Sequence, residues 1–120
     1  SSAVFELGVA SYSCRIKNKV LGVKKETLDT LGAVSYDTAR QMAECIREKA
    51  AADIGVSVTG VAGPDSSEGH MPGLVFIAVA YKGGVTVKEL NISPISREYV
   101  REQAAEQLLK LAFNTVGEVF

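Results

Sequence analysis

The stretch VSVTGVAGPDSSEGHMPGLVFIAVA, residues 56–80, contains two strand-like runs with a long polar loop between them. The first run, residues 53–58, is short and apolar. The second, residues 74–81, is almost continuously apolar, which is typical of a strand that is buried on both faces. The intervening residues are rich in Gly, Pro, Ser and Asp and include the only His of the chain. A loop of this kind either connects the two strands or surrounds a ligand.

The segments on either side of this stretch predict further strands and helices. A β-branched and aromatic run predicts a first strand, and apolar residues at helical spacing predict two longer helices that begin after Ser35 and Ser96. The predicted elements are a strand at 4–13, a helical turn at 24–31, a helix at 36–51, a hairpin strand at 85–92 and a helix from 96 to about 114. This order predicts an α/β fold in which helices cover a mixed β-sheet.

Bulk composition limits the class of protein. The chain has 120 residues, 47% of them hydrophobic and 22% charged, with a net charge of -1. These values predict one globular domain and exclude a disordered chain or a basic surface for nucleic acid. The apolar runs are too short to span a membrane, and the first residues lack the basic start of a signal peptide. We therefore expect a cytoplasmic protein that binds neither nucleic acid nor membrane.

The segment TGVAGP, which follows the first of the two strands, is a candidate binding loop. Gly60 and Gly63 permit positive φ angles, which lets backbone N–H groups converge on an anion or an oxyanion. Thr59 adds a hydroxyl at the carboxyl end of the strand, where open α/β sheets usually bind ligands. The alternative is an ordinary turn that ends at Pro64.

Tyr12 and Lys17 form a second candidate, in the segment YSCRIK. A lysine beside a buried wall can lose its proton and act as a base, or stay charged and bind a phosphate. The alternative is a solvated lysine that shares a charged surface with Arg15 and Lys19. The two Cys and one His of the chain form no zinc pattern and no CxxC, so we predict reduced thiols and no metal site.

Arg97 and Arg101 form a third candidate because they are four residues apart at the start of the last predicted helix. Positive side chains at this end oppose the helix dipole, which suggests that an anion lies between them and the helix N-terminus. The alternative is that Glu98 and Glu102 pair with the two arginines on the surface.

Taken together, these segments resemble the CinA C-terminal domain family, the nicotinamide-nucleotide amidases that include competence/damage-inducible proteins. The resemblance runs in order along nearly the whole chain and rests on the blocks YSCRIKNKVLGV, LGAVSYDTARQMAECIR, ADIGVSVTGVAGP, GLVFIAVA and SREYVREQAAEQLL.

This resemblance implies a three-layer α/β/α sandwich and a bacterial cytosolic amidohydrolase. The implied reaction converts nicotinamide mononucleotide to nicotinate mononucleotide and ammonia, within NAD metabolism, without a metal or another cofactor. Lys17 matches the family's catalytic lysine and Tyr12 the tyrosine near it. Thr59, Gly60 and Gly63 match the substrate loop, and Arg97 or Arg101 matches the arginine of the last helix.

The sequence departs from the family pattern at two places. The nucleophilic serine of the family lies in an upstream ESxTGG segment, whereas Ser1 and Ser2 match the stretch that follows it. We therefore expect residues 1–120 to form a single domain without its first strand and nucleophile segment. The loop DSSEGHMPG also contains fewer glycines than in relatives. The alternative to an amidase is a non-catalytic module that binds a nucleotide or oligomerises, and an exposed sheet edge favours a homo-oligomer.

Overall fold

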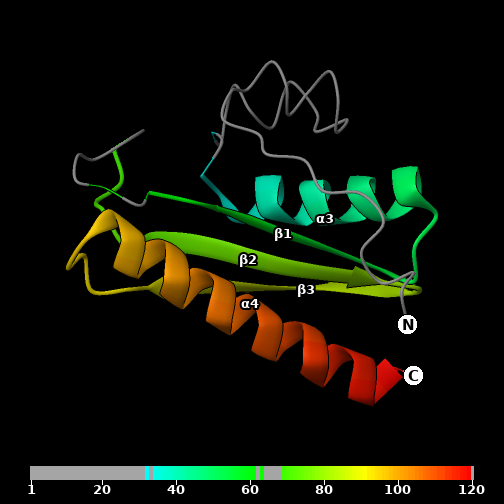
Figure 1. Ribbon diagram of the computed structural model, residues 1–120. Coiled ribbons are helices and arrows are strands. Elements are labelled where there is room, and N and C mark those ends of the chain that lie inside the picture. The colour runs from blue at the N-terminus through cyan, green and yellow to red at the C-terminus, as the bar shows by residue number, and fades with distance from the viewer. Residues whose placement is uncertain (1–31, 33, 62, 64–68, 120) are drawn as a thin grey trace.

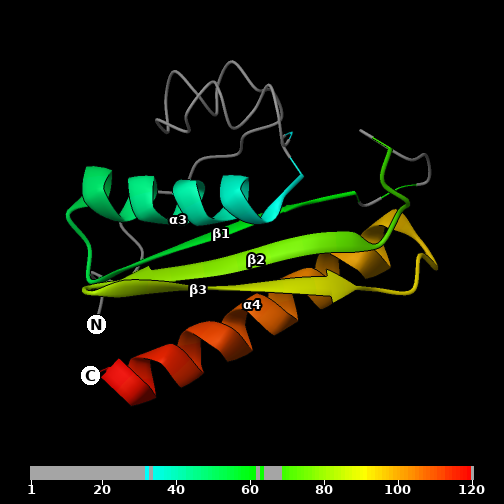
Figure 2. The same ribbon diagram turned by 180° about the vertical axis from the view of Figure 1, so that it is seen from behind.

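In the part of the chain that the structure describes, two helices enclose an antiparallel sheet and form a three-layer sandwich (Figure 1). The computed structural model describes residues 32, 34–61, 63 and 69–119. The elements are α3 (Tyr36–Ala50), β1 (Ile54–Gly60), β2 (Leu74–Tyr81), β3 (Gly84–Asn91) and α4 (Arg97–Val119). Figures 1 and 2 show α3 on one face of the sheet and α4 on the other. The predicted α/β/α sandwich is therefore confirmed.

The sheet has the strand order β1-β2-β3, and both pairs of neighbours are antiparallel. A mixed sheet was predicted, but no parallel pair occurs among the described strands. The hairpin at Gly83, whose φ is 98°, makes β2 and β3 antiparallel neighbours. The predicted strand at 4–13 and the helical turn at 24–31 lie outside the described residues.

The central strand β2 supplies the core on both of its faces, as its continuous apolar sequence predicts. Phe76, Ala78 and Ala80 pack with α3, whereas Ile77 and Val79 pack with α4. Small residues let α3 lie close to the sheet. In the neighbouring strand β1, a Cβ atom added to Gly55 would collide with the carbonyl oxygen of Ala43 in α3.

Helix α3 begins and ends close to where its sequence predicts. Ser35 has an extended backbone, and its side chain accepts a hydrogen bond from the N–H of Thr38, which is a standard N-cap. Ala51, with φ 50°, ends the helix in the left-handed conformation. The face that the periodicity identified is buried along most of its length, at Ala39, Met42, Ala43 and Ile46.

Helix α4 runs to Val119, five residues beyond its predicted end at Asn114. The inner face, with Val100, Ala104 and Leu111, packs on the sheet. The outer face carries Leu109 and Phe113, which are 62% and 78% exposed. Neither α4 nor α3 is long and apolar enough to cross a membrane.

Candidate functional site

The elements that surround the candidate loop meet at one end of the sandwich. Both helices begin at this end, where β1 ends and β2 begins (Figure 1). In α3, the Ala39 carbonyl accepts a 2.7 Å hydrogen bond from the hydroxyl of Ser57 in β1, which fixes the first turn of the helix against the sheet. Helix N-termini carry partial positive charge. This end of the molecule therefore favours an anion.

Arg97 is the first residue of α4 and lies beside the loop. Its Nη1 donates to the carbonyl oxygen of Gly63 at 3.4 Å, a long hydrogen bond. The start of α4 is fixed by Ser96, whose hydroxyl accepts from the N–H of Tyr99 at 3.0 Å, as the predicted N-cap requires. The exposed guanidinium of Arg97 is thus held at the helix N-terminus and next to the loop.

Arg101 lies one turn further along α4 and is exposed. In the described part of the chain it forms no hydrogen bond or ion pair, and neither arginine pairs with Glu98 or Glu102. The structure therefore brings Arg97, and not Arg101, to the loop. The alternative of a neutralised surface cluster is not found.

Thr59 and Gly60 are the last residues of β1, where the sequence predicted a loop after a strand that ends at residue 58. Thr59 is 7% exposed and alternates with Ser57 on the face that α3 covers. Gly60 has no positive φ, so the loop conformation that the sequence predicted for it is wrong. A Cβ atom there would lie 2.7 Å from the Leu74 carbonyl oxygen, and the glycine instead permits close strand pairing.

Gly63 does have the positive φ that the sequence predicted, at 94°. It lies against Pro72, because a Cβ atom built on Gly63 would be 3.2 Å from the Cβ of Pro72. Backbone hydrogen bonds join the residues before the loop to those after it. The N–H of Gly73 donates to the Val61 carbonyl at 2.7 Å, and the N–H of Val61 donates to the Leu74 carbonyl at 2.9 Å. The two ends of the loop are therefore held together.

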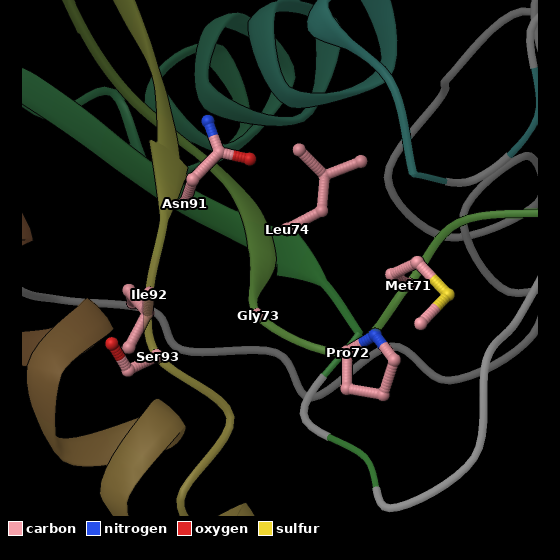
Figure 3. A pocket seen from close by; sticks show the side chains of 7 residues that line it. All are labelled: Met71, Pro72, Gly73, Leu74, Asn91, Ile92 and Ser93. Atoms are coloured by element: carbon pink, nitrogen blue, oxygen red, sulfur yellow. The ribbon is translucent and has the colours of Figure 1, made fainter.

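A pocket of about 270 Å³ opens at this end of the sheet. Figure 3 shows its lining residues, which are Met71, Pro72, Gly73, Leu74, Asn91, Ile92 and Ser93. Pro72 joins the pocket to Gly63 and so to Arg97. Asn91 was not among the predicted site residues, because a polar residue at the end of a hairpin strand is ordinary in sequence.

The first turn of α3 contains a second feature that the sequence did not reveal. The hydroxyl of Thr38 donates to the Gly32 carbonyl at 2.7 Å, and the hydroxyl of Ser35 donates to the same oxygen at 3.1 Å. Thr38 is fully buried. These hydroxyls therefore hold the chain that enters α3, and the Thr38 hydroxyl is not open to a ligand.

The predicted catalytic pair lies outside the described residues, since Tyr12 and Lys17 belong to the first 31 positions. Within the described residues, Cys45 on α3 has a shifted pKa. Burial raises the pKa of this thiol, and the carboxylates of Glu48 and Glu44 raise it further. Cys45 is therefore protonated at neutral pH and a poor nucleophile. No group of His, Cys, Asp and Glu in the described ranges is arranged to hold a metal ion.

Comparison with known proteins identifies relatives along nearly the whole chain. Residues 1–116 match the family described as CinA C-terminal domain. A Bacillus velezensis protein named as competence-damage inducible is 47% identical over 106 residues, which are 88% of this chain and 25% of that protein. A protein of the same name from Thermoanaerobacter sp. is 50% identical over 94 residues, 78% of this chain and 23% of its own length. The chain thus spans about a quarter of the length of the curated relatives it matches.

Solved structures share the same fold. A CinA superfamily protein from Klebsiella pneumoniae has a TM-score of 0.85 and 29% identity, covering 89% of this chain and 67% of its own. The competence/damage inducible protein CihA from Agrobacterium tumefaciens has a TM-score of 0.74 and 38% identity, covering 85% of this chain and 66% of its own.

Proposed function

Because this chain belongs to the CinA C-terminal domain family, we propose that it acts in an amidohydrolase that converts nicotinamide mononucleotide to nicotinate mononucleotide and ammonia. One observation supports this more than any other. Arg97 lies at the N-terminus of α4 with its guanidinium against the Gly63 carbonyl, in the block that resembles the family's substrate loop. This corner suits the phosphate of a mononucleotide.

The electrostatics of the corner favour an anion. A positive side chain in the first turn of a helix is opposed by the helix dipole, and a bound phosphate removes that conflict. A guanidinium has five N–H donors. The bond from Arg97 to Gly63 uses one of them, which leaves enough donors for a bidentate contact with phosphate.

The chemistry follows a Ser/Lys hydrolase. Neutral Lys17 takes the proton of a serine hydroxyl, and the alkoxide attacks the carboxamide carbon. Backbone N–H groups stabilise the oxyanion. The C–N bond then breaks, the nitrogen takes the proton from Lys17 and leaves as ammonia, and water hydrolyses the acyl-enzyme ester to the carboxylate. Tyr12 lies close to Lys17 in sequence and orients it. The serine that the resemblance implies is in an ESxTGG segment, which residues 1–120 do not contain.

The roles proposed for the substrate loop follow from its geometry. Gly63, with its positive φ, supplies the backbone beside the phosphate. Thr59 and Gly60 act from β1: Gly60 keeps this strand close to β2, and Thr59 anchors the strand end beneath α3. Together these residues hold Gly63 within reach of Arg97.

The proposal is tested by incubating the full-length natural protein with nicotinamide mononucleotide and measuring ammonia and nicotinate mononucleotide. Nicotinamide riboside, which lacks the phosphate, is the matched control and is expected to react more slowly. Release of ammonia and nicotinate mononucleotide in equal amounts from nicotinamide mononucleotide supports the amidase. Tight binding of the mononucleotide without any release would contradict it and would support a nucleotide-binding module instead.

A further inference from the structure

We propose that the pocket beside Gly63 binds the nicotinamide ring and that Asn91 recognises its carboxamide. This inference rests on the proposed function and assigns a residue to the part of the substrate that reacts. It concerns β2 and β3, which the resemblance does not connect with the site.

The pocket has the size and lining that a single ring requires. Its volume, about 270 Å³, lies just below the roughly 300–1,000 Å³ of sites for drug-sized ligands, so it suits one ring better than a whole nucleotide. Met71, Pro72 and Leu74 supply apolar walls. Met71 is 74% exposed, and its flexible thioether is well suited to contact the edge of an aromatic ring.

The floor of the pocket is bare backbone. Gly73 has φ 101°, and a Cβ atom there would overlap the Ile92 carbonyl oxygen. The Gly73 carbonyl accepts from the N–H of Ile92 at 2.9 Å, and the Gly73 N–H is also bonded, so these polar groups are satisfied. A flat ring can therefore lie on this floor without leaving a buried donor or acceptor unpaired.

Asn91 lies where it can form hydrogen bonds with the carboxamide of such a ring. It is the last residue of β3 and pairs with Leu74 in the sheet register. Figure 3 shows both side chains on the same side of Gly73, whereas Ile92 and Ser93 turn toward α4. Among the described residues, the Asn91 amide makes a single long contact, in which its Nδ2 donates to Glu89 at 3.4 Å, and the side chain is exposed. Its polar atoms are therefore available to a ligand.

The side chain of asparagine complements a carboxamide but not a carboxylate. Its Oδ1 accepts from the carboxamide N–H while its Nδ2 donates to the carboxamide oxygen. In the product, the carboxylate has no N–H, so one hydrogen bond is lost and Oδ1 faces a negatively charged oxygen. Asn91 therefore favours substrate over product.

The two parts of the site are joined through one wall. Pro72 lines the pocket and lies against Gly63, whose carbonyl accepts from Arg97. A mononucleotide thus has its ring at Asn91 and its phosphate at Arg97, with Pro72 and Gly63 between them.

Equilibrium binding to the full-length natural protein tests this inference. The probes are nicotinamide mononucleotide, nicotinate mononucleotide and ribose 5-phosphate, and the variants are Asn91→Ala, Asn91→Asp and, as a matched control on α4, Asn114→Ala. We expect Asn91→Ala to weaken the binding of nicotinamide mononucleotide about 10-fold, as the loss of one to two hydrogen bonds predicts. The preference for nicotinamide over nicotinate mononucleotide is expected to fall to within about 2-fold, with ribose 5-phosphate and Asn114→Ala unchanged.

Asn91→Asp is expected to bind nicotinate mononucleotide more weakly than wild type, because two carboxylates then face each other. Unchanged affinities in both Asn91 variants, with ammonia release by wild type intact, would overturn this inference alone. An equal loss for all three probes would also overturn it, since a structural defect produces that pattern. Failure of the wild-type protein to bind or hydrolyse nicotinamide mononucleotide would overturn the proposed function as well.

Discussion

Arg97 and Gly63 are 34 residues apart in sequence, and the Nη1 of the first donates to the carbonyl oxygen of the second. This bond joins the start of α4 to the loop that leaves β1. It brings the positive end of a 23-residue helix, a guanidinium and a glycine with positive φ to one corner.

Arg97→Ala in the full-length protein is expected to raise KM for nicotinamide mononucleotide by about 10- to 100-fold. This is the loss of binding expected when a charge-assisted hydrogen bond is removed. Arg101→Ala is the matched control, since it removes the same charge one turn away, and its KM is expected to change by less than about 3-fold. Steady-state kinetics measures both. Equal effects of the two variants would mean that the phosphate is not held by Arg97.

Gly73→Ala is expected to destabilise the domain more than Gly83→Ala. Both glycines have positive φ, so both substitutions carry the left-handed strain of about 1–2 kcal/mol. A Cβ atom at Gly83 meets nothing, whereas at Gly73 it overlaps the Ile92 carbonyl, which adds about 1–3 kcal/mol. Urea unfolding of the two variants measures the difference. Equal free energies of unfolding would show that Gly73 has space for a side chain.

Gly117→Ala is expected to stabilise the domain by about 0.5–1 kcal/mol, because glycine inside a helix is less favourable than alanine. Gly117 lies within α4, and an added Cβ atom meets nothing there. Ala105→Gly, at another exposed position of α4, is the reverse control and is expected to lose a similar amount. Thermal unfolding checks both. A destabilised Gly117→Ala variant would show that this turn of α4 is not a regular helix.

Cys45 is expected to react slowly with iodoacetamide near neutral pH, in a Cys14→Ser background that leaves it as the one thiol within residues 1–120. Burial and the neighbouring carboxylates of Glu48 and Glu44 raise its pKa, so less thiolate is present than in a free peptide at the same pH. The rate of alkylation should therefore rise at a higher pH than in a model peptide. If the alkylation rate rose at the same pH as in the peptide, or at a lower pH, the raised pKa would be contradicted.

Local sequence patterns predicted those features of the fold that local physics decides. Ser35 and Ser96 are N-caps because short hydroxyl side chains satisfy the first free N–H groups of a helix, and this signal is readable in sequence. Gly63 likewise has the positive φ that the sequence predicted for it. Gly60 was misread because a glycine needed for close strand pairing looks the same in sequence as one needed for a turn.

The parts that sequence did not predict depend on contacts between distant residues. Asn91 joins the pocket because Leu74 is its partner in the sheet, and this pairing places the end of β3 beside the loop residues Met71 and Pro72. The choice of Arg97 over Arg101 depends on where the loop lies in space, since the sequence places both arginines in the first turns of the helix but does not show which of them reaches Gly63. All described strands pair antiparallel, and the pairing of β2 with β3 follows from the hairpin that the sequence predicted, whereas the predicted strand at 4–13 lies outside the described residues.

Ammonia release from nicotinamide mononucleotide by the full-length natural protein, compared with its Lys17→Ala and Lys19→Ala variants, tests the central claim most directly. We expect release by wild type and by Lys19→Ala, and a rate at least about 100-fold lower in Lys17→Ala, because the general base is lost. A Lys17→Ala variant that releases ammonia at the wild-type rate, or a folded wild-type protein that releases none, would contradict it.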